Sequence, residues 1–458
     1  MGPIGPILYR LTAPMLLGVL SMVLFNAIDT YFVGQLGKTE LSALSFTFAP
    51  IMILFTLIQG LGIGATALVA KSIGQGNLSK AARETTDSLV LGLIIAATFS
   101  VLGYLFLNPL FRMMGANAQE LPLVVEYMEI WLVTIVFVVV PFLGNSAIRA
   151  TGDARTPALI MLFAVAINAI LDPLLIFGYG PFPELGIRGA ALATAISRGI
   201  TLVLSCWVLY RREKLITLVI PSRQTILGCW RAILNIGLPA GLSRMIVPLA
   251  TMVIYSILAR LENPDVVAGY GVATRVEALA ASLLFALSAS MGPFVGQNFG
   301  MGHYDRILVA NQKANMFAVG WGIVMAILLV WLGDDIASSF TDSEGVAEVA
   351  ALYLVLVPAT IGFQGAVQVV NVTLNALNMP KIAAGIIALQ MFGFYLPLAF
   401  LGAETRGEGG VFVSIAVAYF LGGIISMLVI NRVLVRKIEA QKRQKTIEEQ
   451  DSWEKKRR

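Results

Sequence analysis

The sequence predicts an all-α membrane protein, in which twelve transmembrane helices form two six-helix bundles, as parallel repeats, around a central cavity. Three observations support this prediction. The chain is 57% hydrophobic and only 13% charged, whereas soluble domains are about 45–50% apolar and about 25% charged. Long apolar segments recur along its 458 residues. Motifs of the first half also return in the second half in the same order.

Twelve apolar segments are long enough to cross the roughly 30 Å of hydrocarbon in a bilayer. The first follows MGPIGPILYR directly and is too long for the apolar region of a signal peptide. The predicted spans are 8–35, 42–70, 86–111, 123–148, 156–178, 187–210, 232–259, 267–296, 309–333, 347–376, 382–402 and 410–434.

Basic residues predict the orientation of these spans. Lys and Arg gather in the connections after even-numbered spans, with five between 211 and 231 alone. The connections after odd-numbered spans carry acids instead, such as Asp334 and Asp335. Because short basic loops stay in the cytoplasm, we expect both chain ends on that side.

An internal repeat relates the two halves. LYRLTAPMLLG around Pro14 returns as ILNIGLPAGLS around Pro239, and NSAIRATGDARTPALIM returns as NVTLNALNMPKIAAGII. Six spans per copy is an even number, so both copies enter the membrane from the same side as parallel repeats. The predicted division is a first lobe at 1–210, a cytoplasmic linker at 211–231, a second lobe at 232–434 and a charged cytoplasmic tail at 435–458.

The net charge of +5 does not indicate a nucleic-acid partner. Much of the basic excess lies in short loops and in the tail, which mixes both signs and has almost no apolar face. We interpret the tail as a solvated end that can contact anionic lipid. The only cysteines, Cys206 and Cys229, lie at or near the cytoplasmic face, where a structural disulfide or metal site is not expected.

Polar side chains inside the spans are the candidate functional residues, because a charge in hydrocarbon costs about 2.5–3.5 kcal/mol on insertion scales. At about 1.5 Å per residue, Asp29 and Asp172 both lie roughly 9 Å from the outer face. Asn168 is one helical turn from Asp172 on the same face. Thr194, on the sixth span, is at a similar depth. These four residues are predicted to share one layer of the first lobe.

Two carboxylates in such a layer cannot both ionise at low cost, so the pair can hold a proton or require a cation. Oxygen ligands without His or Cys suit Na⁺ better than a transition metal. The alternative is that Asp29 caps a kink and Asp172 hydrogen-bonds backbone freed beside Pro173.

Arg198 follows Thr194 by four residues and therefore lies on the same helix face. We predict that it reaches the aspartate layer and favours one ionised carboxylate. The alternative is an arginine that binds helix-end carbonyls or extends to the cytoplasm.

The second half has its own charges. Arg244 and Glu277 fall at similar depths on consecutive spans and are predicted to form an ion pair, with a second cation or substrate contact as the alternative. Ile254 stands where the repeat aligns with Asp29, so the acid pair has no counterpart. Pro14 precedes Asp29 by fifteen residues on one span and permits a kink there.

Three motifs now indicate a family. FNAIDTYFVGQLG (25–37), AINAILDPLLIFG (166–178) and GAALAT (189–194), together with the twelve spans and the repeat, resemble the multidrug and toxic compound extrusion (MATE) family. The resemblance extends over about 8–434. The first lobe carries acids, whereas the seventh span has no aligned acid. This pattern looks more like the bacterial or archaeal DinF-type branch than the NorM-type branch.

The resemblance implies a cation-coupling site of Asp29, Asn168, Asp172 and Thr194, with Pro14 at the bend of the first span. It implies export of amphipathic or cationic organic compounds, such as drugs and dyes, in exchange for H⁺ or Na⁺ and without another cofactor. We expect a monomer in a bacterial or archaeal inner membrane. The candidate substrate-lining residues are Phe25, Asn26, Tyr127, Asn145 and Met161.

Two other functions are less consistent with these residues. A flippase for lipids or lipid-linked oligosaccharides, from the related superfamily, would need a cationic cavity, for which Arg198, Arg244 and Arg275 are available. An intramembrane enzyme is not expected. The single histidine, His303, is in a cytoplasmic loop, and the sequence has no metal-spaced His/Cys cluster and no G-x-S-x-G motif.

Overall fold

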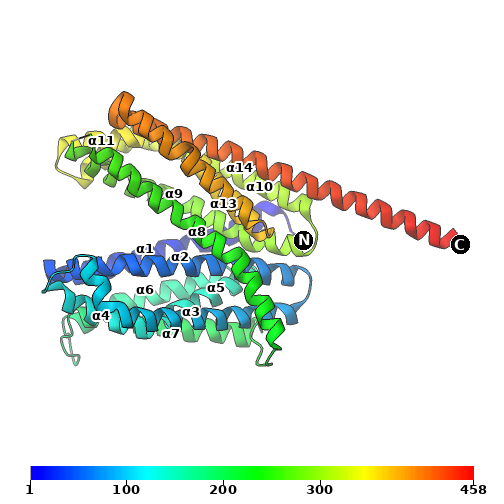
Figure 1. Ribbon diagram of the computed structural model, residues 1–458, viewed down its shortest axis with the longest axis horizontal. Helices are drawn as coiled ribbons and strands as arrows, with labels where there is room; N and C mark the ends of the chain where they lie inside the picture. The colour runs from blue at the N-terminus through cyan, green and yellow to red at the C-terminus, as the bar shows by residue number, and fades with distance from the viewer. Residues whose placement is uncertain (1, 262, 458) are drawn as a thin grey trace. The chain divides into compact units, whose positions relative to one another are not determined.

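The computed structural model describes residues 2–261 and 263–457, with side chains to 447 except at 445. Every regular element in these ranges is a helix (Figure 1). The chain divides into two compact units. The first unit is Arg10–Leu242, and the second unit is Ser243–Arg458 together with Met1–Tyr9.

The first unit holds the helices of the first repeat. α4 and α5 meet at Ile135 with a bend of 45°, and together they are long and apolar enough to form one span. Its elements are α1 (Ile4–Leu36, from Arg10 on), α2 (Lys38–Gly74), α3 (Leu78–Met113), α4 (Glu120–Thr134), α5 (Val136–Ala150), α6 (Arg155–Ile176), α7 (Ile187–Trp207), the π-helix η1 (Val208–Arg212) and the first part of α8 (Arg223–Ala259).

Small residues allow close helix packing in this unit, as is usual between membrane helices. α2 crosses α8 at Gly60 and Gly237, where a Cβ added to Gly60 would lie 2.3 Å from the Gly237 carbonyl oxygen. Leu54 and Ile58 on α2 and Leu132 on α4 are fully or almost fully buried in the main core of this unit. The glycine pair therefore sets how closely α2 and α8 pack.

The second unit holds the remaining helices, several of which are interrupted. Pro358 opens a short 3₁₀ turn between α11 and α12, and a π-helix, η3, separates α13 from α14. Its elements are the rest of α8, α9 (Pro264–Gly300), α10 (Tyr304–Phe340), α11 (Glu344–Leu356), η2 (Pro358–Thr360), α12 (Ile361–Ala376), α13 (Pro380–Ala388), η3 (Leu389–Tyr395) and α14 (Leu396–Arg457).

Ten described helical segments are long and apolar enough to cross a membrane, and the bent pair α4 and α5 makes eleven. The segment Pro380–Gln444 is 65 residues long and contains two non-helical residues, Arg406 and Gly407. Gly407 has φ of 60°, a conformation that glycine adopts readily. This break lies between the predicted spans 382–402 and 410–434, and counting it as a loop gives the twelve predicted spans.

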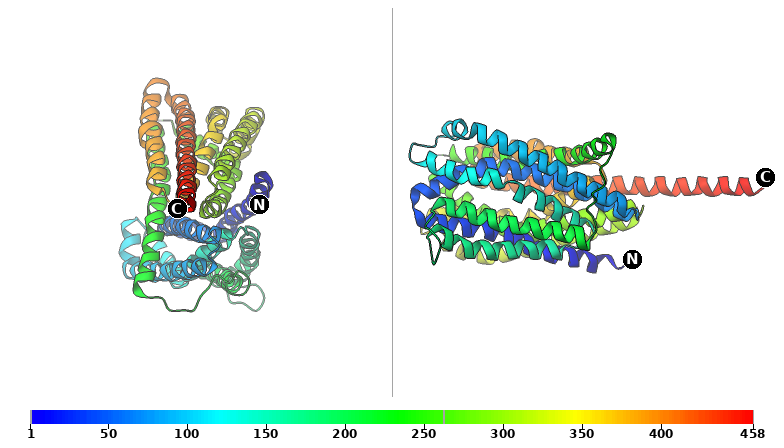
Figure 2. Two further views of the ribbon diagram at one scale, coloured as in Figure 1. Left: turned by 90° about the vertical axis from the view of Figure 1, so that its right-hand side faces the viewer. Right: turned by 90° about the horizontal axis from the view of Figure 1, so that it is seen from below.

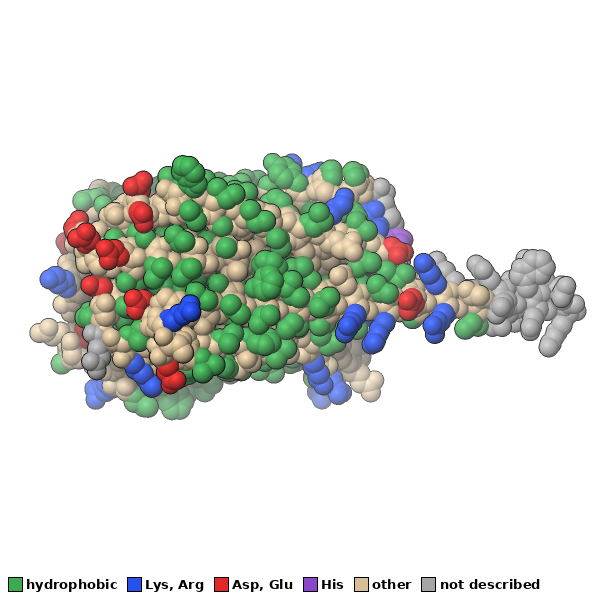
Figure 3. Space-filling model, turned by 90° about the horizontal axis from the view of Figure 1, so that it is seen from above, with side chains coloured by type: hydrophobic (Ala, Val, Ile, Leu, Met, Phe, Trp, Pro, Cys, Tyr) green, Lys and Arg blue, Asp and Glu red, His purple; other side chains and the backbone are tan. Residues whose placement is uncertain are grey.

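The surface matches the prediction of membrane spans. On the face seen in Figure 3, hydrophobic side chains cover the middle, while charged side chains gather toward the two ends. Acids predominate at one end, and Lys and Arg predominate at the other. Such a band is what a bilayer requires of a multi-pass protein.

The predicted linker packs on the first unit. Leu215 is buried in a core cluster with Val69 and Ala147, and the backbone nitrogen of Thr217 donates to Thr86 Oγ1 at 3.0 Å. α8 begins at Arg223 and continues past residue 242, so the boundary between the units falls inside a helix.

The predicted charged tail continues α14 as a helix to Arg457. It extends beyond the other helices of its unit (Figure 2). The start of the tail contacts the turn between α9 and α10. There Lys437 Nζ lies 5.7 Å from the centroid of the Phe299 ring, and Gln441 Nε2 donates to the Gly302 carbonyl at 2.9 Å.

Candidate functional site

The two aspartates of the first unit meet in its interior. Asp29 comes from the later part of α1 and Asp172 from the later part of α6. Their side chains are 8% and 0% exposed, and the two carboxyl groups lie within hydrogen-bonding reach of each other. The acids predicted to share one layer therefore form a direct pair.

Asn168 and Thr194 complete this group. Asn168 Nδ2 donates to Asp172 Oδ1 at 3.1 Å from one turn away on α6, and the Asn168 side chain also lies beside Asp29. Thr194 Oγ1, on α7, lies 3.4 and 3.5 Å from the two carboxylate oxygens of Asp29. Three helices thus bring together the four predicted residues.

Two oxygens of this group lack partners. Asp172 Oδ2 and Asn168 Oδ1 are buried and accept no hydrogen bond from the described residues. A buried acceptor without a donor costs about 1–3 kcal/mol. A proton on one of the two carboxyls would supply a hydrogen bond between them, and a bound Na⁺ would satisfy the same oxygens. The residues present therefore fit either ion.

Arg198 turns toward the acids. Its guanidinium carbon lies 4.2 Å from the centroid of the Phe25 ring, its Nη1 lies 3.9 Å from Met161 Sδ, and its charge interacts with that of Asp29. This placement agrees with the prediction that Arg198 reaches the aspartate layer. Tyr127 is buried nearby and interacts with both acids and with Arg198.

Other predicted residues lie apart from this group. Asn26 is exposed, and its Nδ2 donates to the Met22 carbonyl at 3.1 Å within α1. Asn145 is buried, and its Oδ1 accepts from Ser205 Oγ at 3.0 Å between α5 and α7. Pro14 lies inside α1, which runs as one helix from Ile4 to Leu36.

The predicted ion pair between Arg244 and Glu277 is wrong. Glu277 instead accepts a hydrogen bond from the Tyr353 hydroxyl and lies near Tyr419, while the Arg244 guanidinium lies 5.6 Å from the centroid of the Phe285 ring. Equal depth on consecutive helices does not fix which way each helix face points. The tyrosines were missed because the apolar segments that contain them gave no other polar signal.

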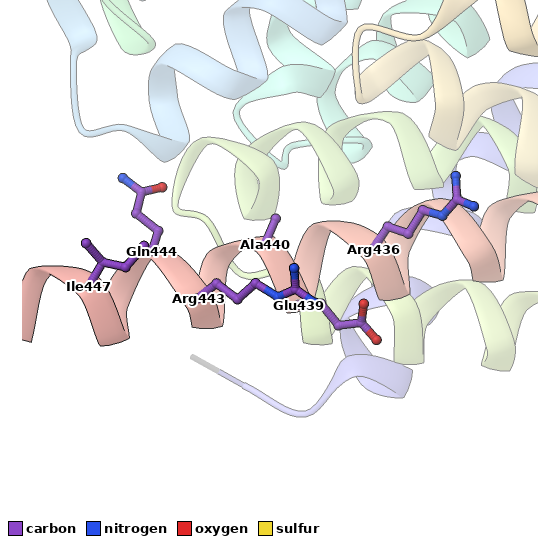
Figure 4. A pocket seen from close by; sticks show the side chains of 6 residues that line it. All are labelled: Arg436, Glu439, Ala440, Arg443, Gln444 and Ile447. Carbon is purple, nitrogen blue, oxygen red and sulfur yellow. The ribbon is translucent and has the colours of Figure 1, made fainter.

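A shallow hollow also lies beside the tail. Figure 4 shows its lining, which comes from α14 alone. The lining residues are Arg436, Glu439, Ala440, Arg443, Gln444 and Ile447. Because a single helix lines this hollow, its side chains do not converge on a small ligand. The acid group of the first unit is therefore the stronger candidate site.

Comparison with known proteins identifies the family. The MatE family model matches residues 14–174 and 239–401, once in each half. The chain belongs to the MatE family. The two matched segments also coincide with the repeat predicted around Pro14 and Pro239.

Named relatives and a solved structure match almost the whole chain. A FAD transporter of Shewanella oneidensis is 35% identical over 431 residues, which are 94% of this chain and 95% of that protein. The multidrug export protein MepA of Staphylococcus aureus is 24% identical over 432 residues, 93% of this chain and 94% of that protein. The crystal structure of the Vibrio cholerae MATE transporter VcmN in the bent form has a TM-score of 0.89 and 29% identity, over 95% of this chain and 98% of that chain.

These findings confirm the predicted MATE resemblance and the all-α fold with twelve membrane helices. The MatE protein is thus a multi-pass membrane transporter and not an enzyme.

Proposed function

We propose that this MatE protein is a cation-coupled antiporter that exports amphipathic organic compounds by alternating access, with coupling through Asp29 and Asp172. The observation that carries the proposal is the buried acid pair, in which Asp172 Oδ2 meets no donor. A group that needs a proton or a cation, placed inside a transporter, provides a means to couple two fluxes. We place the protein in a bacterial or archaeal inner membrane with both chain ends in the cytoplasm, because its basic loops favour that side.

In the proposed cycle, the cation and the substrate stabilise different states of the first unit. A bound proton or Na⁺ holds the Asp29 and Asp172 carboxyls together, and its release leaves two negative groups that repel each other. Arg198 then favours the ionised form of Asp29, since their charges attract. A ligand can shift a conformational equilibrium only by its differential affinity for the two states. The acid pair provides that difference for the cation.

Protons are the favoured coupling ion. A hydrogen bond between two carboxyls forms only when one of them is protonated, and the Asp29 and Asp172 carboxyls lie within reach of such a bond. Na⁺ is the second candidate, because the buried oxygens of Asn168 and Asp172 also suit a hard cation.

The relatives indicate two candidate substrate classes. MepA suggests multidrug export, whereas the relative with the higher identity is a FAD transporter. FAD is therefore a second candidate substrate. Arg198 stacked on Phe25 offers a cation and an aromatic face, which suit a planar anionic ring system as well as an amphipathic drug.

Everted membrane vesicles test the proposal. Uptake of a fluorescent cationic dye and of FAD would be followed after a pH gradient or a Na⁺ gradient is imposed separately. We expect uptake driven by the pH gradient, and its loss in Asp29→Asn and Asp172→Asn. The exposed acid Asp342 provides a matched control, since Asp342→Asn should retain transport. Wild-type uptake by both site variants would refute coupling through the pair.

A further inference from the structure

The connection between η1 and α8 contains an exposed apolar segment. Residues 214–223, which we call the linker strap, have the sequence KLITLVIPSR, in which basic residues flank an apolar run without an acid. Leu218, Val219 and Ile220 are 81%, 74% and 92% exposed. Apolar side chains that gather on a protein surface often mark a contact with a membrane or a partner. The strap therefore needs an occupant for its apolar side.

Hydrogen bonds hold the strap against the start of α3. The backbone nitrogen of Thr217 donates to Thr86 Oγ1 at 3.0 Å. Arg83 Nη1 donates to the Val219 carbonyl, and Arg83 itself forms an ion pair with the buried Asp87 one turn along α3. The strap is thus held through its backbone, which leaves its apolar side chains available for another contact.

α3 gives the level of the strap relative to the bilayer. α3 is long and apolar enough to cross a membrane, and the third predicted span begins at residue 86. Thr86 is also the residue that accepts from the strap. Arg83, the second contact, lies three residues earlier and so about 4.5 Å further out on the basic side. The strap therefore lies at the border between hydrocarbon and headgroups.

Aromatic residues mark the same level at the end of α7. Trp207 is the last residue of α7, Tyr210 lies in η1, and both are exposed. Tyrosine and tryptophan are enriched at membrane–water interfaces. The Arg211 guanidinium carbon lies 5.9 Å from the centroid of the Tyr210 ring, which places a basic group at this level as well. Two helices, α3 and α7, thus agree on the depth of the strap.

The basic ends of the strap determine which lipids fit it. Lys214 and Arg223 are both exposed, and neither takes part in an ion pair among the described residues. The adjacent acid, Glu213, is already paired with Arg212. Basic residues beside apolar side chains that enter the interface strengthen binding to anionic lipids. The charge of the strap is therefore complementary to anionic headgroups.

We propose that the linker strap anchors the first unit to the leaflet on the basic side of the bilayer. Leu218, Val219 and Ile220 enter the headgroup region, while Lys214 and Arg223 bind anionic lipid headgroups. Lipid is the occupant because the strap lies at the border of α3, a helix that crosses the same bilayer. Arg223 is also the first residue of α8, so the anchor fixes the depth at which α8 begins. The inference does not depend on the transported ion or substrate.

Fluorescence quenching in liposomes tests the anchor. The full-length protein would carry Cys206→Ala and Cys229→Ala, and a maleimide fluorophore would be attached at Ile220→Cys. Lipids with a nitroxide near the headgroup should quench this label about twofold more than a label at Ser79→Cys, an exposed position in the first turn of α3. A label at Val101→Cys, exposed further along α3, should respond best to a nitroxide deep in the acyl chain. Equal quenching at positions 220 and 79 would overturn the proposal.

The charge of the lipid tests the basic ends. Quenching at Ile220→Cys should be stronger in vesicles that contain phosphatidylglycerol than in phosphatidylcholine alone, and Lys214→Gln/Arg223→Gln should remove this difference. The matched control is Lys442→Gln/Arg443→Gln, at an exposed pair in the tail, which should retain it. Equal quenching in the two lipids would overturn the choice of anionic headgroups. A label shielded from both lipid nitroxides and aqueous iodide would show that protein covers the strap, and would overturn the anchor.

The hold of α3 on the strap can be tested separately. Thr86→Val keeps the shape of the side chain and removes the oxygen that accepts from Thr217. A nitroxide attached at Ile220→Cys should then become more mobile, which narrows the lines of its electron spin resonance spectrum. Unchanged line shapes would contradict the positioning of the strap by α3. None of these measurements requires transport, so they can succeed or fail independently of coupling through the acid pair.

Discussion

The guanidinium carbon of Arg198 lies 4.2 Å from the centroid of the Phe25 ring, which joins α7 to α1 beside the acid pair. Arg198 is thereby held where its charge interacts with Asp29. The stacked ring limits the movement of the arginine, because a guanidinium packs well on an aromatic face. The positive charge of the site is thus fixed by packing as well as by attraction.

Arg198→Ala should therefore raise the pH at which transport is lost by protonation, by about one unit, because an ionised carboxylate loses its nearby cation. The measurement is vesicle uptake as a function of pH at a fixed gradient. Arg198→Lys keeps the charge without the planar stack and should shift the profile less. An Arg198→Ala profile identical to wild type would show that the arginine does not affect the acids.

Pro14→Ala tests the proposed bend in α1. Proline has no N–H and disfavours a helix interior by about 3 kcal/mol relative to alanine. The variant should therefore unfold at a higher temperature and yet transport several-fold more slowly, because α1 bends less readily. Pro109, an exposed proline inside α3, provides the control, and Pro109→Ala should transport normally. Normal uptake by Pro14→Ala would remove the proposed hinge.

Asp153, in the connection between α5 and α6, should contribute to the stability of the fold in a pH-dependent way. Burial would raise the pKa of Asp153, but hydrogen bonds from Thr156 and Arg212 outweigh burial and hold this pKa below its ordinary value of 3.8. A lowered pKa in the folded state means that ionised Asp153 stabilises the fold above the ordinary value. This contribution is lost as the pH falls through the lowered pKa.

Asp153→Asn should accordingly unfold at a lower temperature than wild type at neutral pH, and the difference should shrink toward zero below the ordinary pKa of 3.8. Thermal unfolding in detergent, followed by tryptophan fluorescence at several pH values, measures this. Asp342→Asn, at an exposed acid, should behave like wild type throughout. A difference between Asp153→Asn and wild type that stays constant with pH would contradict the prediction.

Two glycines of α8 should respond oppositely to alanine. A Cβ at Gly237 would lie 2.9 Å from the Gly60 carbonyl oxygen, whereas a Cβ at Gly228 meets nothing within 4 Å. Gly237→Ala should destabilise the protein by about 1–3 kcal/mol through overpacking. Gly228→Ala should stabilise it by about 0.5–1 kcal/mol through helix propensity. Thermal unfolding of both variants measures these changes in stability. Equal changes in the unfolding temperature would be evidence against close packing of α2 on α8.

Depth and helix periodicity predicted much of the site. Asn168 and Asp172 are four residues apart, so one helix face had to present both. Asp29 and Thr194 were matched to them by distance along their spans. These arguments succeed because helix rise and span length are fixed by geometry. Rotation about the helix axis is fixed by packing, which is why the Arg244–Glu277 pair was predicted and the tyrosines were missed.

The direction of individual side chains was the other feature that the sequence did not predict. Two directions were open for Arg198, and contact with Phe25 and Met161 distinguishes them. Asn145 looked like a residue that lines a cavity, but Ser205 binds it inside the packing of α5 and α7. The bend at Ile135 between α4 and α5 also had no sequence signal that we recognised.

The enclosed acid pair of the first unit limits the energetics of transport. A carrier whose Asp29 and Asp172 pair takes one proton would exchange one proton for each substrate molecule. For a neutral substrate, the concentration ratio that the proton gradient alone sustains would then equal the proton ratio. The transferred charge also gains about 2.3 kcal/mol per 100 mV of membrane potential. The number of protons that this pair binds and releases would thus set the steepest substrate gradient that the transporter can maintain.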